Sequence, residues 1–251
     1  MTFFDSDRPL IFAHRGGMAL GPENTIQAFD AGINAGADGL ELDVHLAADG
    51  IVVVHHDRTL ERTTRGSGPL AARTAAELAA LDVPTLADVL RRYPAARVII
   101  EMKEERAALG HAVAADVRAA GAVDRVCAAG FGRAAVGAAR EALPAMATSA
   151  SQAEVRRALH RTWVCWPLRS CAWQGYQVPE TAGRLRVVSP RFIRYAHAAG
   201  LRVQVWTVDT EPDMIRLLDW GVDALISNRP DLAVQVRDRW VSARQSAGAA
   251  R

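Results

Sequence analysis

The feature that most constrains the fold of this chain is a regular alternation between short apolar runs and longer amphipathic helical patterns. Apart from one hairpin, eight runs resemble strands, and nearly all of them precede a helical pattern. The eight runs are Leu10–Ala13, Gly39–Leu46, Arg97–Met102, Val126–Ala129, Ala145–Ser149, Leu185–Val188, Val203–Thr207 and Ala224–Ser227. This order predicts an α/β chain that closes as a (β/α)₈ TIM barrel. An open doubly wound sheet is the alternative, but His14-Arg15-Gly16-Gly17 does not match the glycine pattern of a dinucleotide-binding turn.

Turn and cap residues refine this prediction. The length of 251 residues fits one barrel, and we expect a single domain over residues 1–241 and a frayed, small and polar tail over 242–251. Asp49-Gly50 before Ile51–Val54 predicts a small hairpin after the second strand. Asn24 is the predicted cap of the first helix. The segment Arg161–Gly183 has no clean period and is predicted to be a long connection.

Composition and charge exclude several classes of protein. A formal net charge of +2, with no run of like charges, predicts no nucleic-acid partner and no stable association with a membrane. Three cysteines have neither the even count of a disulfide framework nor the spacing of a zinc site, which indicates free thiols in a reducing compartment. The first residues lack the plan of a signal peptide, and no stretch has the length of a membrane span. We therefore expect a cytoplasmic protein.

Polar residues at the carboxyl ends of the predicted strands are the first candidates for function, because a parallel barrel places its active site there. Glu41 and Asp43 are two residues apart in one strand, so their side chains share a face. Glu101 in the next barrel strand would add a third carboxylate, and each repulsion near 4 Å costs about 4 kcal/mol at an effective dielectric of about 20. One divalent cation, Mg²⁺ or Ca²⁺, would neutralise them with oxygen ligands alone. Protonation, or ion pairs with Arg15 and Lys103, is the alternative.

Two histidines accompany these acids. His14 and His56 can each exchange a proton near neutral pH, so one can accept a proton while the other donates one. A lone histidine at a strand end is more often structural, but two beside an acidic pair favour acid–base chemistry. Neighbouring residues of a strand point to opposite faces, so only one of His55 and His56 should face the site. We assign His56 to it.

Cationic and aromatic residues complete the candidate site. Arg15 and Lys103 can hold the oxygens of a phosphate group, or they can be ordinary surface ion pairs. Trp206 at a strand end can lie against a ligand or pack in the core at the top of the barrel. Three further aromatic residues, for which packing is favoured over recognition of a quaternary ammonium, are Trp166, Trp173 and Tyr176.

These pieces, in this order, resemble the glycerophosphodiester phosphodiesterase family. The matching motifs are His14-Arg15-Gly16, Pro22-Glu23-Asn24-Thr25, the segment Gly36–Val44, Asp49-Gly50, His56-Asp57, the segment Arg62–Gly66, Glu101-Met102-Lys103, Val205-Trp206-Thr207-Val208, Gly221-Val222-Asp223 and Arg229-Pro230-Asp231. The chain departs from the family pattern at Asp209, where the family often has Asn, and at Ser227-Asn228, where it often has Thr-Asp or Thr-Asn. The stretch between Arg62 and Glu101 is short, so we expect that an inserted cap is missing and that the pocket is more open.

The resemblance implies both a site and a reaction. It implies a metal on Glu41, Asp43 and Glu101, with His14 and His56 as the acid–base pair. It also implies hydrolysis of a glycerophosphodiester to glycerol 3-phosphate and an alcohol, through a cyclic phosphate that water opens. The alternatives are a phospholipase-D-like phosphotransferase acting on intact lipids and a non-catalytic barrel that binds a phosphate ligand. The head group, the metal, the order in which the histidines act and the oligomeric state stay open.

Overall fold

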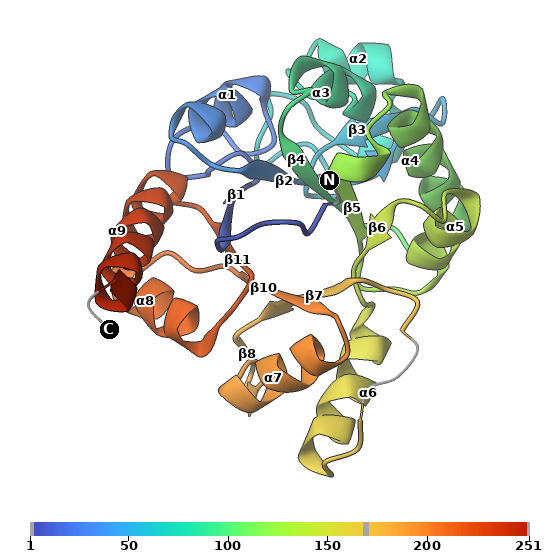
Figure 1. The fold of residues 1–251 in the computed structure, drawn as a ribbon. Coiled ribbons are helices and arrows are strands. Elements are labelled where there is room, and N and C mark those ends of the chain that lie inside the picture. Colours follow the sequence, from blue (N-terminus) through green and yellow to red (C-terminus); the bar gives the residue numbers. More distant parts are fainter. Residues whose placement is uncertain (1–2, 168–170, 250–251) are drawn as a thin grey trace.

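Eight parallel strands form the barrel, and helices surround it (Figure 1). The computed structural model describes residues 3–167 and 171–249. The barrel strands are β1 (Leu10–His14), β2 (Gly39–Leu46), β4 (Arg97–Met102), β5 (Val126–Ala129), β6 (Ala147–Thr148), β7 (Gly175–Pro179), β10 (Arg202–Trp206) and β11 (Ala224–Ser227). Pairing is continuous from β6 through β1 to β7, and a parallel bridge between Ser149 and Gly175 completes the ring. The predicted (β/α)₈ architecture is confirmed.

The helices cover the outer face of the strands (Figure 1). They are α1 (Ile26–Asn34), α2 (Ala75–Ala79), α3 (Leu86–Arg92), α4 (Ala107–Ala119), α5 (Ala134–Ala142), α6 (Gln152–Trp163), α7 (Pro190–Ala198), α8 (Glu211–Trp220) and α9 (Pro230–Ala249), with 3₁₀ turns η1 (Leu70–Ala72) and η2 (Val123–Arg125). Within the described part of the chain, none of these helices combines the length and the apolar character that crossing a membrane requires.

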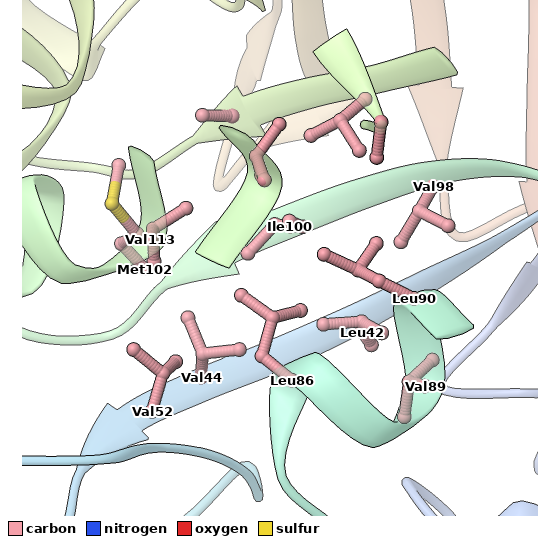
Figure 2. Packing of buried hydrophobic residues seen from close by; sticks show 14 of the residues in the cluster. Leu42, Val44, Val52, Leu86, Val89, Leu90, Val98, Ile100, Met102 and Val113 are labelled. Carbon is pink, nitrogen blue, oxygen red and sulfur yellow. The ribbon is translucent and has the colours of Figure 1, made fainter. Parts of the chain in front are cut away.

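Strand β2 shows how one segment both anchors the barrel and carries functional groups. All eight of its residues are buried. Leu42 and Val44 pack outward beside Leu86 of α3, as Figure 2 shows. Since side chains alternate along a strand, Glu41 and Asp43 point the other way, toward the barrel interior. Hydrophobic burial on one face therefore fixes the position of two acids on the other.

The predicted hairpin after β2 is present, but the cap of α1 is the residue that follows the predicted one. Strand β3 (Val52–Val54) pairs antiparallel with β2. Thr25, not Asn24, caps α1, because the Thr25 side chain accepts the N–H of Ala28 at 3.2 Å. Asn24 has a left-handed backbone with φ of 58°, and its side chain turns toward Asp43. Both residue types favour caps, so the local pattern could not separate them.

One barrel strand lies in a different segment from the prediction. The strand is Gly175–Pro179, inside the segment predicted to be a connection, whereas Leu185–Arg186 (β9) pairs only with Thr181–Ala182 (β8) in a small hairpin. Tyr176 is fully buried and packs on Phe192 of α7 at 5.2 Å between ring centroids. The strand has only five residues among aromatic and turn residues, so the apolar run at 185–188 gave a stronger but misleading signal.

The chain end also differs from the prediction of a frayed tail. Helix α9 extends through Ser242–Ala249, and residues 250 and 251 lie outside the described residues. This segment is rich in alanine, the best helix former, so it continues the helix readily. Earlier in α9, Arg237 is 1% exposed and forms ion pairs with Asp38 and Asp238. The pair with Asp38, the residue before β2, links the helix to the start of that strand, whereas Asp238 lies in α9 itself.

Two helical glycines provide a matched test of packing. A Cβ on Gly110 of α4 would lie 2.1 Å from the carbonyl oxygen of Ala135 in α5, whereas a Cβ on Gly137 of α5 would meet no described atom within 4 Å. We expect Gly110→Ala to lower the free energy of unfolding by about 1–3 kcal/mol through overpacking. Gly137→Ala should raise it by about 0.5–1 kcal/mol, because alanine is the better helix former. Urea unfolding measures both, and equal effects would contradict the close α4–α5 contact.

Candidate active site

Register places the predicted acids and a histidine side by side at the mouth of the barrel. His14 of β1 is the partner of Glu41 in β2, and Asp43 is the partner of Glu101 in β4. One carboxylate oxygen from each of the three acids lies within 4.8 Å of the other two. Two oxygens bound to one Ca²⁺ at about 2.3–2.6 Å can be as much as about 5 Å apart. The three carboxylates therefore fit one cation of this kind.

Two cationic side chains contact the acidic cluster. The Nζ of Lys103 lies 2.9 Å from Asp43 Oδ1 and 2.6 Å from Glu101 Oε1, and the Nε of Arg15 lies 3.2 Å from Asp43 Oδ2. Burial opposes the charge of Lys103, but Asp43 and Glu101 together outweigh burial and raise its pKa. Pairing with Arg15 and Lys103, the alternative weighed from the sequence, thus occurs for two of the acids.

Glu41 has a different environment from the other two acids. It is 4% exposed, accepts the backbone N–H of Arg15 at 3.0 Å, and lies 3.8 Å from Nε2 of His14. Burial, and then the charges of Asp43 and Glu101, raise the pKa of Glu41 well above its ordinary value. The three acids outnumber the two side-chain cations that contact them, so a doubly positive ion would relieve a real excess of negative charge.

A chain of hydrogen bonds orients His14. Its Nδ1 lies 2.6 Å from Oδ1 of Asn228, and Nδ2 of Asn228 donates to Asp209 Oδ2 at 2.7 Å. Because the Asn228 oxygen accepts, Nδ1 of His14 carries a hydrogen and Nε2 is left free to accept a proton. Burial lowers the pKa of His14, and the bond to Asn228 partly offsets this effect. Asp209 and Ser227, the two departures from the family pattern, contact each other through a hydrogen bond of 3.0 Å from Ser227 Oγ to Asp209 Oδ1, and Asp209 supports His14 through Asn228.

An ion-pair network orients His56. Its Nδ1 lies 2.6 Å from Oδ1 of Asp57. Arg62 bridges Asp57 and Glu23, with bonds of 2.8 and 2.7 Å to the two Glu23 oxygens, and Glu23 also accepts Nη1 of Arg15 at 3.0 Å. The hydrogen bond from Arg62 is the largest cause that holds the pKa of Asp57 well below its ordinary value. One arginine thus connects the supports of His56 and Arg15.

His55 and His45 lie near the two candidate histidines, but both contact backbone carbonyl oxygens. His55 is buried, and its Nε2 lies 3.1 Å from the carbonyl oxygen of Thr59. His45 is buried as well, and its Nε2 lies 3.1 Å from the carbonyl oxygen of His56. His56 lines the same cavity as Glu41 and Glu101, whereas His55 is not among the residues that line it.

A cavity of about 200 Å³ lies between these groups. Its lining combines six predicted polar residues with aromatic, amide and aliphatic side chains: His14, Arg15, Glu41, His56, Glu101, Lys103, Phe131, Gln177, Trp206, Thr207 and Ile226. Asp43 is 1% exposed and lies behind this lining, where it accepts Nδ2 of Asn24 at 2.8 Å. The structure therefore brings together every predicted site residue, including Trp206, which meets Phe131 edge-on at 6.2 Å.

The sequence did not reveal the role of several residues of this site, among them Asn24, Gln177 and Phe131. Asn24 was interpreted as a helix cap, although its place in a matching motif was a signal for another role. Gln177 lies in the strand that was not recognised, and its Nε2 donates to Gln204 Oε1 at 2.9 Å. Phe131 follows β5 in a loop with no distinctive pattern.

Three aromatic residues of undecided role lie elsewhere. Trp173 and Tyr176 meet edge-on at 6.2 Å, and Trp166 is 62% exposed. They are not among the residues that line the cavity. Packing, the favoured interpretation from the sequence, describes Trp173 and Tyr176.

Comparison with known proteins agrees with the geometry. Residues 14–232 match the model of the glycerophosphoryl diester phosphodiesterase family. The chain is 32% identical over 250 residues to a probable glycerophosphodiester phosphodiesterase of Mycobacterium tuberculosis, covering 92% of each chain. Among solved structures, it is similar to the glycerophosphodiester phosphodiesterase of Agrobacterium tumefaciens, with a TM-score of 0.73 and 27% identity over 90% of this chain and 98% of that one. It is also similar to a phosphodiesterase of Oleispira antarctica solved with its product sn-glycerol-3-phosphate, with a TM-score of 0.74 and 25% identity over 92% and 97% of the two chains. This chain belongs to the glycerophosphoryl diester phosphodiesterase family.

Proposed function

We propose that this enzyme hydrolyses glycerophosphodiesters to glycerol 3-phosphate and an alcohol, with one Mg²⁺ or Ca²⁺ ion held by Glu41, Asp43 and Glu101. The observation that carries the proposal is that the three acids, two histidines and two cationic side chains converge on one small cavity. The product bound to the Oleispira antarctica relative supports the same class of substrate here. A bound dication would supply Lewis-acid stabilisation of the negative charge that develops on the oxygens of the reaction.

The residues of this chain have separate tasks in the proposed reaction. Arg15 and Lys103 bind the non-bridging oxygens of the phosphate, Arg15 through its planar fork and Lys103 as a point charge. The hydroxyl of glycerol next to the phosphoester attacks phosphorus, the bond to the departing alcohol breaks, and water then opens the cyclic phosphate. Trp206 lies against the organic part of the substrate at the rim.

The hydrogen-bond partners of the two histidines distinguish their roles. Nε2 of His14 is free to accept, and burial lowers the pKa of its ring, so His14 takes the proton of the attacking hydroxyl. Oδ1 of Asp57 lies 2.6 Å from Nδ1 of His56 and orients its ring, so that its Nε2 can give a proton to the departing alcohol. The two exchange roles when water opens the cyclic phosphate.

Removing either histidine tests the chemistry. We expect His14→Ala and His56→Ala each to lower kcat by about 100- to 10,000-fold on glycerophosphocholine, because each removes one proton-transfer group. Release of glycerol 3-phosphate is the measurement, and circular dichroism checks folding. His55→Ala is the matched control and should keep most of the activity. If the unmodified protein were inactive across a panel of glycerophosphodiesters, a binding role would replace the catalytic one.

Metal removal tests the acidic cluster. Chelation should abolish activity, and Mg²⁺ or Ca²⁺ at about 100 times its dissociation constant should stabilise the fold by about 2.7 kcal/mol, raising Tm by roughly 5–10 °C. Glu41→Gln removes a buried acid with a raised pKa, so at neutral pH the metal-free variant should be more stable than the metal-free parent. The variant should also lose most of the stabilisation by metal. Full activity after chelation would remove the metal from the proposal.

Arg62 tests the network behind His56. We expect Arg62→Gln to lower kcat about 10- to 100-fold, because both His56 and Arg15 lose their indirect support. Arg91→Gln, which removes an exposed ion pair with Asp88, is the control and should change nothing.

Arg62→Gln should also change how the free energy of unfolding depends on pH. In the folded protein the pKa of Asp57 lies below its value of about 3.9 in the unfolded chain. Asp57 therefore contributes to the free energy of unfolding above about pH 3.9, and this contribution is lost as the pH falls through the folded-state pKa. The difference in unfolding free energy between the parent and Arg62→Gln should therefore be complete above about pH 5 and shrink below about pH 4. A difference that does not change with pH would show that Asp57 is not held by Arg62.

A further inference from the structure

An apolar groove of about 360 Å³ adjoins the catalytic cavity. We define it by six of its lining residues: Phe131, Val155, Leu159, Leu185, Val187 and Trp206. Helix α6 forms one wall and the β8–β9 hairpin with the segment after it forms the other. Both elements lie on the same side of the barrel in Figure 1.

The groove and the catalytic cavity are continuous. Four residues line both of them: Glu101, Phe131, Gln177 and Trp206. A molecule whose phosphate lies between Arg15 and Lys103 can therefore extend past Trp206 into the groove. Continuity with the cavity makes the groove a place for part of a substrate rather than an isolated surface hollow.

The chemistry of the groove selects an aliphatic group. Among the described residues that line it, only Glu101 and Arg156 carry charge, and Glu101 belongs to the acidic cluster. Leu159 and Val187 are each 4% exposed, whereas Leu185 is 39% exposed and Phe131 is 52% exposed at the rim. A charged or strongly polar group would lose its hydration there with few partners to replace it. A hydrocarbon chain would instead cover apolar surface that is now open to water.

We propose that the apolar groove binds a single aliphatic chain of the substrate, so that the enzyme prefers glycerophosphodiesters that carry one such chain. This inference rests on the proposed function. The chain can be attached to the glycerol, as in a monoacyl glycerophosphodiester, or to the departing alcohol.

The covalent steps of the proposed reaction are unchanged. The free glycerol hydroxyl forms a bond to phosphorus and loses its proton to one histidine, while the bond to the alcohol breaks and the other histidine protonates that alcohol. Water then opens the ring.

The same mechanism sets a limit on the substrate. A glycerophosphodiester with chains on both remaining hydroxyls has no hydroxyl beside the phosphoester to attack phosphorus. Such a molecule can occupy the groove with one chain but cannot react by this route. The proposal therefore predicts cleavage of one-chain substrates whose hydroxyl next to the phosphoester is free, and no cleavage of substrates with chains on both remaining glycerol hydroxyls.

Two series of short-chain substrates, kept below the concentration at which micelles form, test the proposal on the metal-loaded enzyme. One series carries acyl chains of four to ten carbons on the terminal glycerol hydroxyl of glycerophosphocholine, which leaves the hydroxyl next to the phosphoester free, and the other is glycerol phosphodiesters of straight-chain alcohols of the same lengths. In at least one series, kcat/KM should rise by up to about fourfold for each methylene buried until the groove is full. The series that responds identifies where the chain is attached. No rise in either series would overturn the proposal.

Two variants test whether the dependence on chain length arises in the apolar groove. Leu185→Glu places a charge in the groove and should cancel the chain-length dependence, while hydrolysis of unmodified glycerophosphocholine changes less than twofold. Ile215→Glu on α8 is the matched control, because Ile215 is also 39% exposed but lies outside the groove. The Ile215→Glu variant should keep the full dependence of kcat/KM on chain length. A dependence that survives Leu185→Glu would also overturn the proposal. Absence of glycerophosphocholine hydrolysis in the parent enzyme would instead contradict the proposed function itself.

Discussion

The arrangement at the barrel mouth depends on holding three carboxylates together against their mutual repulsion. Register brings Glu41, Asp43 and Glu101 to one place, and apolar packing on the opposite faces of β2 and β4 keeps them there. Arg15 and Lys103 compensate part of the negative charge, yet Glu41 stays buried with a raised pKa. The hydrophobic core thus provides the free energy that maintains an electrostatically unfavourable site, as is common where function requires clustered charge.

Around this cluster, each histidine is held by a different kind of partner. A neutral amide, itself fixed by Asp209, holds His14, and a carboxylate anchored by Arg62 holds His56. Two chemically similar rings therefore have unlike electrostatic surroundings, which is what a reaction needs when one group must accept a proton and another must donate it. Arg62 also reaches Glu23 and, through it, Arg15, so that phosphate binding and proton transfer share one support.

Most of the architecture, and every proposed ligand and proton-transfer residue, could be predicted from the sequence. Alternation revealed most strands, and a period of two placed Glu41 and Asp43 on one face. The sequence misled where local signals competed. Leu185–Val188 is more apolar than Gly175–Pro179, but pairing with β10 makes the latter the barrel strand. Asn24 is a good cap by type, but the buried Asp43 binds its side chain. Such choices depend on contacts between distant segments, which no local pattern contains.

The ring of strands closes at the short bridge between Ser149 and Gly175. Strand β6 has two residues, and between it and β7 the backbone bonds are those from Ala150 to Gly175 and from Gln174 to Thr148. Elsewhere the ring is joined by longer ladders, such as that between β2 and β4. Side chains reinforce this short seam, because Gln174 Oε1 accepts the N–H of Thr148 at 2.9 Å and Ser149 Oγ accepts the N–H of Gln177 at 3.1 Å. Ser149 and Gln177 also line the apolar groove, so the wall of the groove and the closure of the ring depend on the same side chains, whereas the acids lie on the long ladder between β2 and β4.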